Sequence, residues 1–401
     1  MVVSIAFVEI LLAITCFLFL RRLSFNDGLP WNWPIIGMLP AVFFNFHRLH
    51  KKCIDVLERS KGTFKGKGVW FTNMEVLLTS DPINVQYITS KSLSNYPKGS
   101  DSKEIFEIVG EGLFNTDHDE WRKQRKMIHA FLNHQGFHRV TAETFGVVNL
   151  ETGLVPVLDH VSQQDIVVDL QDLFERLMFD VACILATGYD PCCLRIGFPQ
   201  VPFLKAMEGA CEVMLHRHIM PRSIWELQRW LGIGKEKIHT HAYKTIDLAL
   251  TKYLSMKQEE MSRGTKLKDE DKEGFDMLKF FLTQGSEIYG KTLTDQIMKG
   301  NLVGLIFGVQ DTTSIALTWL FWLISKNPSV ETKIREEIQA TFPSKEGEKL
   351  RYFVNREERQ TRLQKMLQAH IANFQYQQNL RVAQLCYSKL TRSIPTKLGV
   401  S

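Results

Sequence analysis

The sequence predicts a mainly α-helical protein with a small region of β-sheet, preceded by a single membrane-spanning helix. Three observations lead to this fold class. The longest apolar stretch, residues 301–326, contains no proline and few charges, and such a run predicts a long buried helix. Residues 2–20 are almost entirely apolar. The short β-type runs that are typical of strands are confined to residues 63–88.

The N-terminal segment 2–20 is long enough to cross a bilayer, and Glu9 is its only charged residue. Arg21 and Arg22 follow directly, and by the positive-inside rule they leave the remainder of the chain in the cytosol. A cleaved signal peptide would have a basic start and small residues at a cleavage site, which this segment lacks. We therefore expect residues 1–22 to form an uncleaved anchor.

A hinge, a helix and the predicted β region follow the anchor. Residues 23–41 are rich in proline, which predicts a stiff, extended connector. Residues 47–59 predict a first helix. Short β-type runs follow at residues 68–71 and 76–79, and Asp81-Pro82 predicts the start of another helix.

The second half of the chain predicts further helices around the central one. Residues 165–188 form an amphipathic pattern that ends in Gly-Tyr-Asp-Pro, a usual helix stop. The helical pattern resumes at Phe275, after a charged loop at residues 266–273. Asn327-Pro328 ends the central helix, and residues 330–340 predict a short helix after it.

The central stretch 301–326 carries a short polar group, Gln310-Asp311-Thr312-Thr313-Ser314. In a bilayer a carboxylate at this depth costs roughly 3 kcal/mol, whereas in a protein core it marks a place where something is bound. We therefore favour a buried core helix, with a second membrane span as an alternative. Another interpretation of the polar group is a kink in which threonine hydroxyls bond back to the helix carbonyls.

Composition and charge exclude several classes of function. The chain has 401 residues, of which 44% are hydrophobic and 23% charged, as in proteins with a sizeable core. The net charge of +5 is too small to indicate nucleic-acid binding. Seven cysteines without the spacing of a disulfide framework indicate a reducing compartment. The pairs His216/His218 and His239/His241 would point apart on a helix, so we expect no metal site there.

A basic helix is predicted after the loop at residues 110–117. Trp121 and Arg125 lie four residues apart and therefore share one face of this helix. An indole N–H and a guanidinium fork are suitable donors to a buried carboxylate. The alternative is an exposed basic helix with one tryptophan tucked against the protein.

The polar group and its setting resemble the signature of a known enzyme family. Residues 308–313, Gly-Val-Gln-Asp-Thr-Thr, are similar to the pattern Ala/Gly-Gly-x-Asp/Glu-Thr-Thr/Ser of haem-thiolate monooxygenases, the cytochrome P-450 superfamily. The Trp121 and Arg125 pair is similar to the family's site for a haem propionate. Residues 203–208 and 216–234 look like plant members that hydroxylate fatty acids and long alkanes, nearest to the mid-chain alkane hydroxylases of wax synthesis.

The resemblance implies the haem-thiolate monooxygenase fold and a b-type haem. Asp311 and Thr312 would relay protons into the oxygen pocket, Gly308 would line that pocket, and Trp121 and Arg125 would hold a haem propionate. The implied reaction is hydroxylation of a long aliphatic chain with O2 and NADPH, with electrons from a membrane reductase. The implied location is the endoplasmic reticulum membrane, with the bulk of the chain in the cytosol.

The sequence departs from the family pattern in two places. The family has glycine where this chain has Val309, and a β-branched side chain would crowd the oxygen pocket. The loop that supplies the axial thiolate, Phe-x-x-Gly-x-Arg-x-Cys-x-Gly, is missing. Cys386 is the only cysteine after the central helix, and none of the four other motif residues is present around it. We therefore assign Cys386 no ligand role and expect no axial cysteine in this chain.

The character of the sequence changes after Phe353. Residues 354–401 are rich in glutamine, have no acidic residue after Glu358 and lose the family pattern. We therefore expect a partial catalytic domain at residues 42–353 followed by a divergent basic tail, in a C-terminally truncated and inactive family member. A shifted reading frame, a retained intron or a gene-model error would produce such a tail. The alternative is a non-catalytic, membrane-anchored degenerate homologue that binds at most partners or lipid.

Overall fold

The computed structural model describes residues 12–17, 29–72, 74–144, 152–263 and 275–341. The described residues form two compact units, one comprising those up to Lys98 together with Ile219–Ile224, and the other comprising Gly99–His218 and those from Trp225 onward. Of the predicted anchor, only residues 12–17 are described, and they are helical and exposed. The predicted tail at residues 354–401, with Cys386, lies outside the described residues.

The smaller unit contains the predicted β region. Strand β1, Thr63–Gly66, pairs antiparallel with β2, Val76–Thr79. The strand predicted at residues 68–71 was wrong, because these residues belong to the connection between β1 and β2. Phe71 has a left-handed φ of 61°, which ends an extended run, and Gly68 packs so closely on Met74 that a Cβ there would lie 2.3 Å from the Met74 Cβ.

The predicted hinge, residues 23–41, is turned rather than extended in its described part. The N–H of Trp33 donates to the carbonyl of Gly37 at 2.8 Å, and the N–H of Gly37 donates back to Trp33 at 2.9 Å. Ile35 lies between them with a left-handed φ of 64°. The expected extended conformation is not found, because Gly37, with a φ of 58°, lets the chain fold back on itself.

The helix predicted after Asp81 begins at Pro82, and the one predicted at residues 47–59 begins at Leu49. A helix at Leu39–Phe44, partly inside the predicted hinge, was not expected. Asp81 caps the helix that begins at Pro82, because its side chain accepts a hydrogen bond from the N–H of Ile83 at 2.9 Å. The α-helices are α2 (Leu39–Phe44), α3 (Leu49–Arg59) and α4 (Pro82–Gln86), and the shorter helical turns are η1 (Phe46–Arg48), η2 (Tyr87–Lys91) and η3 (Leu93–Asn95).

The larger unit consists of helices and loops in the ranges that the structure describes. Its long helices are α6 (His118–Leu132), α7 (Gln135–Glu143), α8 (Val155–Gln163), α9 (Leu170–Thr187), α10 (Pro202–Ile219), α12 (Gly234–Ser262), α15 (Asp295–Lys326) and α16 (Pro328–Thr341). The shorter elements are α5 (Gly99–Ile105), η4 (Glu107–Val109), η5 (Leu113–Asn115), α13 (Met277–Phe280), η7 (Phe281–Gly285) and α14 (Ser286–Tyr289), and α11 (Arg222–Leu231) connects α10 to α12. The predicted fold class, mainly α with a small sheet, is confirmed.

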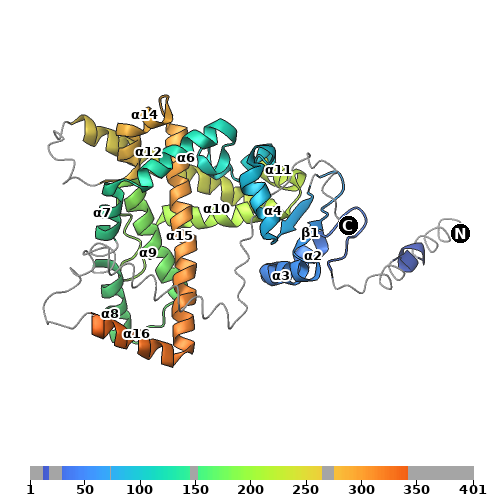
Figure 1. Cartoon of the computed structure of the whole chain (residues 1–401), viewed down its shortest axis with the longest axis horizontal. Coiled ribbons are helices and arrows are strands. Elements are labelled where there is room, and N and C mark those ends of the chain that lie inside the picture. Colours follow the sequence, from blue (N-terminus) through green and yellow to red (C-terminus); the bar gives the residue numbers. More distant parts are fainter. Residues whose placement is uncertain (1–11, 18–28, 73, 145–151, 264–274, 342–401) are drawn as a thin grey trace. The chain divides into compact units, whose positions relative to one another are not determined.

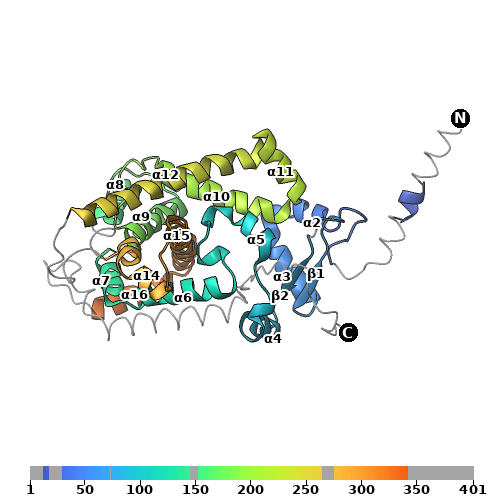
Figure 2. The ribbon, with the colours of Figure 1, turned by 90° about the horizontal axis from the view of Figure 1, so that it is seen from above.

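Helix α15 is the predicted central helix, and α9 packs along it (Figure 1 and Figure 2). It begins at Asp295, six residues earlier than predicted, because the Thr294 hydroxyl caps it by accepting from the N–H of Ile297 at 3.3 Å. The helix is buried between Ile297 and Ile306, but Trp319 and Trp322 near its end are 58% and 49% exposed. The predicted burial is therefore right for the first half of the helix only.

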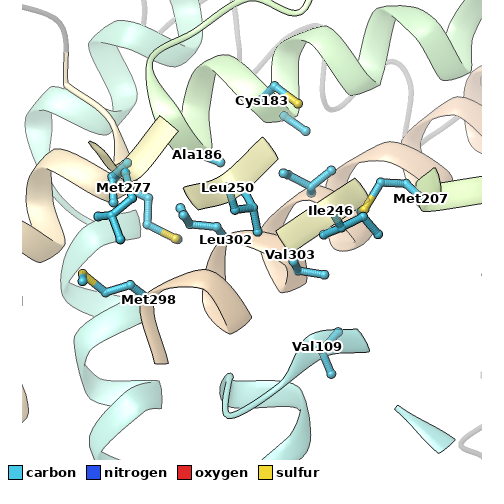
Figure 3. Packing of buried hydrophobic residues seen from close by; sticks show 14 of the residues in the cluster. Val109, Cys183, Ala186, Met207, Ile246, Leu250, Met277, Met298, Leu302 and Val303 are labelled. Carbon is cyan, nitrogen blue, oxygen red and sulfur yellow. The ribbon is translucent and has the colours of Figure 1, made fainter. Parts of the chain in front are cut away.

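The hydrophobic core of the larger unit is built around this first half of α15. Figure 3 shows Leu302 and Val303 of α15 beside Ile246 and Leu250 of α12, in one cluster that also includes side chains of α9 and α10. Leu302 is fully buried, which contributes about 1.5–3 kcal/mol relative to an exposed leucine. This packing fixes α15 in the unit and leaves its second half to carry exposed groups.

Helix α9 starts later than the predicted range of residues 165–188. It begins at Leu170, where the side chain of Asp169 accepts from the N–H of Gln171 at 2.8 Å. Residues 166–168 are Ile-Val-Val, whose β-branched side chains favour the extended backbone seen here. The predicted stop is confirmed, since Gly188 follows the helix with a left-handed φ of 82°.

Among the described residues one helix, α15, is long and apolar enough to cross a membrane, judged by length and composition alone. The share of its most apolar window that is buried inside the protein is 33%. Core helices of soluble proteins pass the same test.

Candidate functional site

Gly308 and Thr312, two of the predicted site residues, lie one turn apart on an exposed face of α15. The hydroxyl of Thr312 donates to the carbonyl of Gly308 at 2.7 Å, which is the back-bonding considered for the polar group. A Cβ placed on Gly308 would meet no other atom within 4 Å. This face, called the open face below, therefore has room for a ligand directly against the helix backbone.

Asp311 does not share the open face. It is one residue before Thr312 and so lies about 100° round the helix, where its Oδ2 accepts a hydrogen bond from the thiol of Cys211 on α10 at 3.3 Å. Within the described residues no hydrogen bond joins Asp311 to Thr312 directly. The two residues that the sequence predicts as a proton relay are therefore neighbours on the helix but face different surroundings.

Val309 lies on the side of α15 that faces the core. It is partly buried and packs against both hydrophobic clusters of the larger unit. The crowding expected from a β-branched side chain at this position is therefore not found on the open face, where Gly308 and Thr312 lie. The reason is again the helical step of about 100°, which turns the Val309 side chain away from that face.

Trp121 and Arg125 lie on one face of α6, as their spacing predicts. The guanidinium carbon of Arg125 is 5.2 Å from the centre of the Trp121 ring, within the range of a cation–π contact. Trp121 is half-buried and Arg125 is exposed. Since no ion pair engages Arg125 within the described part of the chain, its five N–H donors are available to a carboxylate from a ligand.

A buried pair of amides fixes α6 against α15. The side-chain amide of Asn301 donates to the Gln124 Oε1 at 2.9 Å, and the Gln124 amide donates to the carbonyl of Glu111 at 2.8 Å. The Oδ1 of Asn301 accepts from the N–H of Leu113 at 3.0 Å. Gln124 is 1% and Asn301 3% exposed, so these bonds are desolvated and hold the rotation of α6 about its axis.

The loop before α6 touches α15 backbone to backbone. A Cβ on Gly300 would lie 2.5 Å from both the nitrogen of Gly112 and the carbonyl oxygen of Val109, distances that real atoms do not reach. Two glycines therefore set how closely the loop approaches α15. Through this contact the loop that leads into α6, the helix of Trp121 and Arg125, is packed against α15.

Glu120 ties the start of α6 to the end of α14. The Tyr289 hydroxyl donates to the Glu120 carboxylate, and the ammonium of Lys291 lies 3.3 Å from it. The hydrogen bond from Tyr289 lowers the pKa of Glu120, with Lys291 and Lys123 acting in the same direction. This contact orients the first turn of α6, which carries Trp121.

A buried guanidinium anchors α10, the helix that carries Cys211. The side chain of Arg217 is fully buried and donates to both Glu236 oxygens, at 2.8 and 2.6 Å, and to Glu107 at 3.2 Å. Burial, and then the charge of Arg217, lowers the pKa of the neighbouring His239 to about 4. A guanidinium buried in this way needs its carboxylate partners, so α10 and α12 are held in register.

The described cysteines lie away from the open face, except for Cys211 beside Asp311. Cys183 and Cys193 are buried in the hydrophobic core, and burial raises the pKa of both thiols. Cys192 is exposed and contacts Asp190 and Arg195. Within the described residues no group of three or more His, Cys, Asp or Glu side chains is placed to hold a metal ion.

Gly308 and Arg125 each have the chemistry that a part of the expected haem needs. The open face of α15 has free space at Gly308 for a flat group, and no carboxylate of the described residues pairs with Arg125. Sequence reasoning missed the residues that position these groups, namely Cys211, Gln124 and Asn301. Asn301 and Gln124 are 177 positions apart, and Cys211 and Asp311 are 100 apart, so no local spacing could have paired them.

Comparison with known proteins identifies one matching family model and several similar plant proteins. A family model described as cytochrome P-450 matches residues 28–371. The chain is 35% identical to the alkane hydroxylase MAH1 of Arabidopsis thaliana over 87% of this chain and 70% of that protein. It is 36% identical to noroxomaritidine synthase 1 of Narcissus pseudonarcissus, over 83% and 63%, and 34% identical to cytochrome P-450 86B1 of Arabidopsis thaliana, over 84% and 59%. The chain thus spans between 59% and 70% of the length of these relatives.

Proposed function

The chain belongs to the cytochrome P-450 family, whose members are haem monooxygenases, and we propose that its inherited reaction is the hydroxylation of long-chain aliphatic compounds with O2 and NADPH. Similarity to an alkane hydroxylase supports this substrate class. Because noroxomaritidine synthase 1 has a similar identity, overall identity does not select between substrates. The proposal rests more on residues 203–208 and 216–234, which resemble alkane and fatty-acid hydroxylases.

The site assignment is supported by the open face at Gly308 on α15, together with Arg125 on α6, which is exposed and forms no ion pair with another described residue. A bound haem supplies the iron at which dioxygen is activated. Arg125 and the Trp121 indole N–H would donate to a propionate carboxylate, and Gly308 would leave room against the helix. Asp311, on the side of α10, and Thr312, on the open face, would relay protons to the pocket once Asp311 is released from Cys211.

We further propose that this chain contains the propionate and oxygen-pocket residues of the haem site but no axial thiolate, so that the chain by itself is inactive. The support is the sequence around Cys386, which matches none of the other motif residues. Alternatively, the chain is a non-catalytic, membrane-anchored relative that does not bind haem. The apolar segment 2–20, followed by Arg21 and Arg22, supports an anchor in the endoplasmic reticulum membrane with the bulk of the chain cytosolic, where a reductase would act.

The first test is haem binding to the full chain in membranes. We expect added haem to bind with a Soret band, but the reduced, carbon-monoxide-bound spectrum should lack the long-wavelength band of thiolate ligation. Arg125→Ala should weaken binding about tenfold or more, since a charge-assisted hydrogen bond contributes about 1.5–3 kcal/mol. Lys126→Ala, an exposed cation on the same helix, is the matched control and should leave the affinity unchanged.

Each outcome separates the alternatives. A long-wavelength band would show that a cysteine of this chain does ligate iron, and the proposed inactivity would be wrong. Binding that Arg125→Ala and Lys126→Ala weaken equally would remove the assigned propionate site. An absence of haem binding, with the protein present in the membrane, would leave the non-catalytic relative as the description of this chain.

A further inference from the structure

The carboxylate of Asp311 accepts a hydrogen bond from a thiol and not from a positively charged side chain. Cys211 Sγ lies 3.3 Å from Asp311 Oδ2, and within the described ranges no Lys, Arg or His side chain forms an ion pair with Asp311. The acids near this contact are Glu175 on α9 and Glu208 on α10. Burial raises the pKa of both and neighbouring acids act in the same direction, opposed by a hydrogen bond from Gln171 at Glu175 and by the charge of Arg176 at Glu208. Among the described residues, the Cys211 thiol is the side-chain donor to Asp311.

The thiol of Cys211 is protonated in this environment. Burial raises its pKa well above the usual range, and Asp311, Glu175 and Glu208 act in the same direction. The S–H group is therefore the donor and the Asp311 carboxylate is the acceptor at neutral pH. A thiol is a weak donor, whereas an arginine or lysine at the same place would hold a carboxylate much more strongly.

The contact is placed by rigid parts of the molecule. Cys211 belongs to α10, which the buried Arg217 fixes through Glu236 and Glu107. On α15, Thr312 lies about 100° round the helix from Asp311, and its hydroxyl donates a hydrogen bond to the Gly308 carbonyl. The helical step directs Asp311 toward α10, and the thiol of Cys211 holds its carboxylate there.

We propose that Cys211 is a positioning residue, which holds Asp311 away from Thr312 so that the carboxylate reaches the open face only when this hydrogen bond is released. Because a thiol is a weak donor, breaking this hydrogen bond costs little free energy. This inference rests on the proposed relay role of Asp311, but the contact itself requires neither haem nor turnover. Its failure can therefore be told apart from failure of the proposed function.

The direct test is the infrared S–H stretching band of Cys211 in the full chain in lipid nanodiscs. The difference between the wild-type and Cys211→Ala spectra isolates the band, and the same subtraction in an Asp311→Asn background shows the effect of removing the carboxylate. We expect the band at lower frequency in the wild type, because a carboxylate accepts more strongly than an amide. Asp295→Asn, an exposed acid at the start of the same helix, is the control and should leave the band in place.

Alkylation of Cys211 by iodoacetamide, followed by peptide mass spectrometry, gives a second measurement. At pH 8.5, Asp311→Asn should raise the alkylation rate about tenfold, because the Asp311 carboxylate raises the pKa of the Cys211 thiol and its removal favours the thiolate. Asp295→Asn should leave the rate unchanged, and both variants should retain the helical content of the wild type. An unshifted S–H band together with equal alkylation rates in the two variants would overturn the proposal. A shifted band, combined with haem binding that ignores Arg125→Ala, would support the contact while removing the proposed function.

Discussion

Individual glycines on α15 differ in what surrounds them, although the sequence shows only that they recur along one helix. Gly300 touches the backbone of the loop before α6, whereas Gly308 faces open space. His239 and Arg217 show the same dependence on surroundings. They are a buried neutral base beside a buried cation, and this pairing follows from the packing of three helices rather than from their spacing in the sequence.

The two glycines should respond oppositely to alanine. Gly300→Ala places a Cβ 2.5 Å from the Gly112 nitrogen and the Val109 oxygen, so the loop must move, and we expect a loss of about 2–4 kcal/mol in the free energy of unfolding. Gly308→Ala meets no atom and should stabilise the helix by about 0.5–1 kcal/mol. Urea denaturation followed by circular dichroism checks both, and equal effects of the two substitutions would contradict the close contact.

His239 should make the chain sensitive to mild acid. Its pKa is lowered from 6.5 to about 4 in the folded state, so the unfolded chain takes up the proton first as the pH falls. The stability contribution of the neutral ring is therefore complete above pH 6.5 and is lost between pH 6.5 and 4. We expect the wild type to lose about 2 kcal/mol between pH 7.5 and 5 that His239→Gln does not lose.

The control for this pH effect is His241→Gln, since His241 is exposed on the same helix. Urea midpoints at the two pH values give the comparison. A pH dependence that is equal in His239→Gln and the wild type would show that His239 is not buried as a neutral base.

Between elements, the main connection to the site is the buried amide pair that joins α6 to α15. Local rules predicted the start of α4 after Asp81 and the end of α9 at Gly188, because caps and stops act within a few residues. The start of α15 was placed six residues late, since Thr294 lies outside the apolar run that marked the helix. The contacts across elements could not be predicted, because each depends on how the whole unit packs.

Asn301→Leu should uncouple these two helices. It leaves the Leu113 N–H and the Gln124 Oε1 buried without partners, and we expect the free energy of unfolding to fall by about 3 kcal/mol. Asn133→Leu removes an exposed asparagine whose bond is to His129 and should change it by no more than about 0.5 kcal/mol. If the two variants unfold at the same urea concentration, the buried amide pair does not stabilise the contact between α6 and α15.

At the scale of the whole molecule, the sequence predicted the fold class and which candidate site residues share a helix face. It did not predict which neighbouring helices those residues contact. The pairs Trp121 with Arg125 and Gly308 with Thr312 each lie together, because they are four residues apart on a helix. The separation of Asp311 from Thr312 follows from the helical step of about 100°, and what only the structure reveals is the contact of Asp311 with Cys211 on a neighbouring helix. The position of α15 relative to a membrane can be tested on the full chain.

We expect α15 to lie in the folded protein rather than in the bilayer, since it buries the polar Asn301, Gln310 and Ser314. A glycosylation acceptor added after Ser401 should then remain unmodified in microsomes. An acceptor added before Val2 should be modified, because residues 1–22 are proposed to place the N-terminus in the lumen. A glycan on the C-terminal acceptor would instead make α15 a second span.

The buried Arg217 has a consequence for motion. Separating α10 from α12 would leave a desolvated guanidinium without its carboxylates, at a cost of about 3–5 kcal/mol. Arg217 also lies 4.8 Å from the Trp225 ring centre, so its contacts hold α10 to α12 within the larger unit. A displacement of α12 would therefore act on α10, which carries Cys211. A displacement of these helices would thus change the hydrogen bond between Cys211 and Asp311.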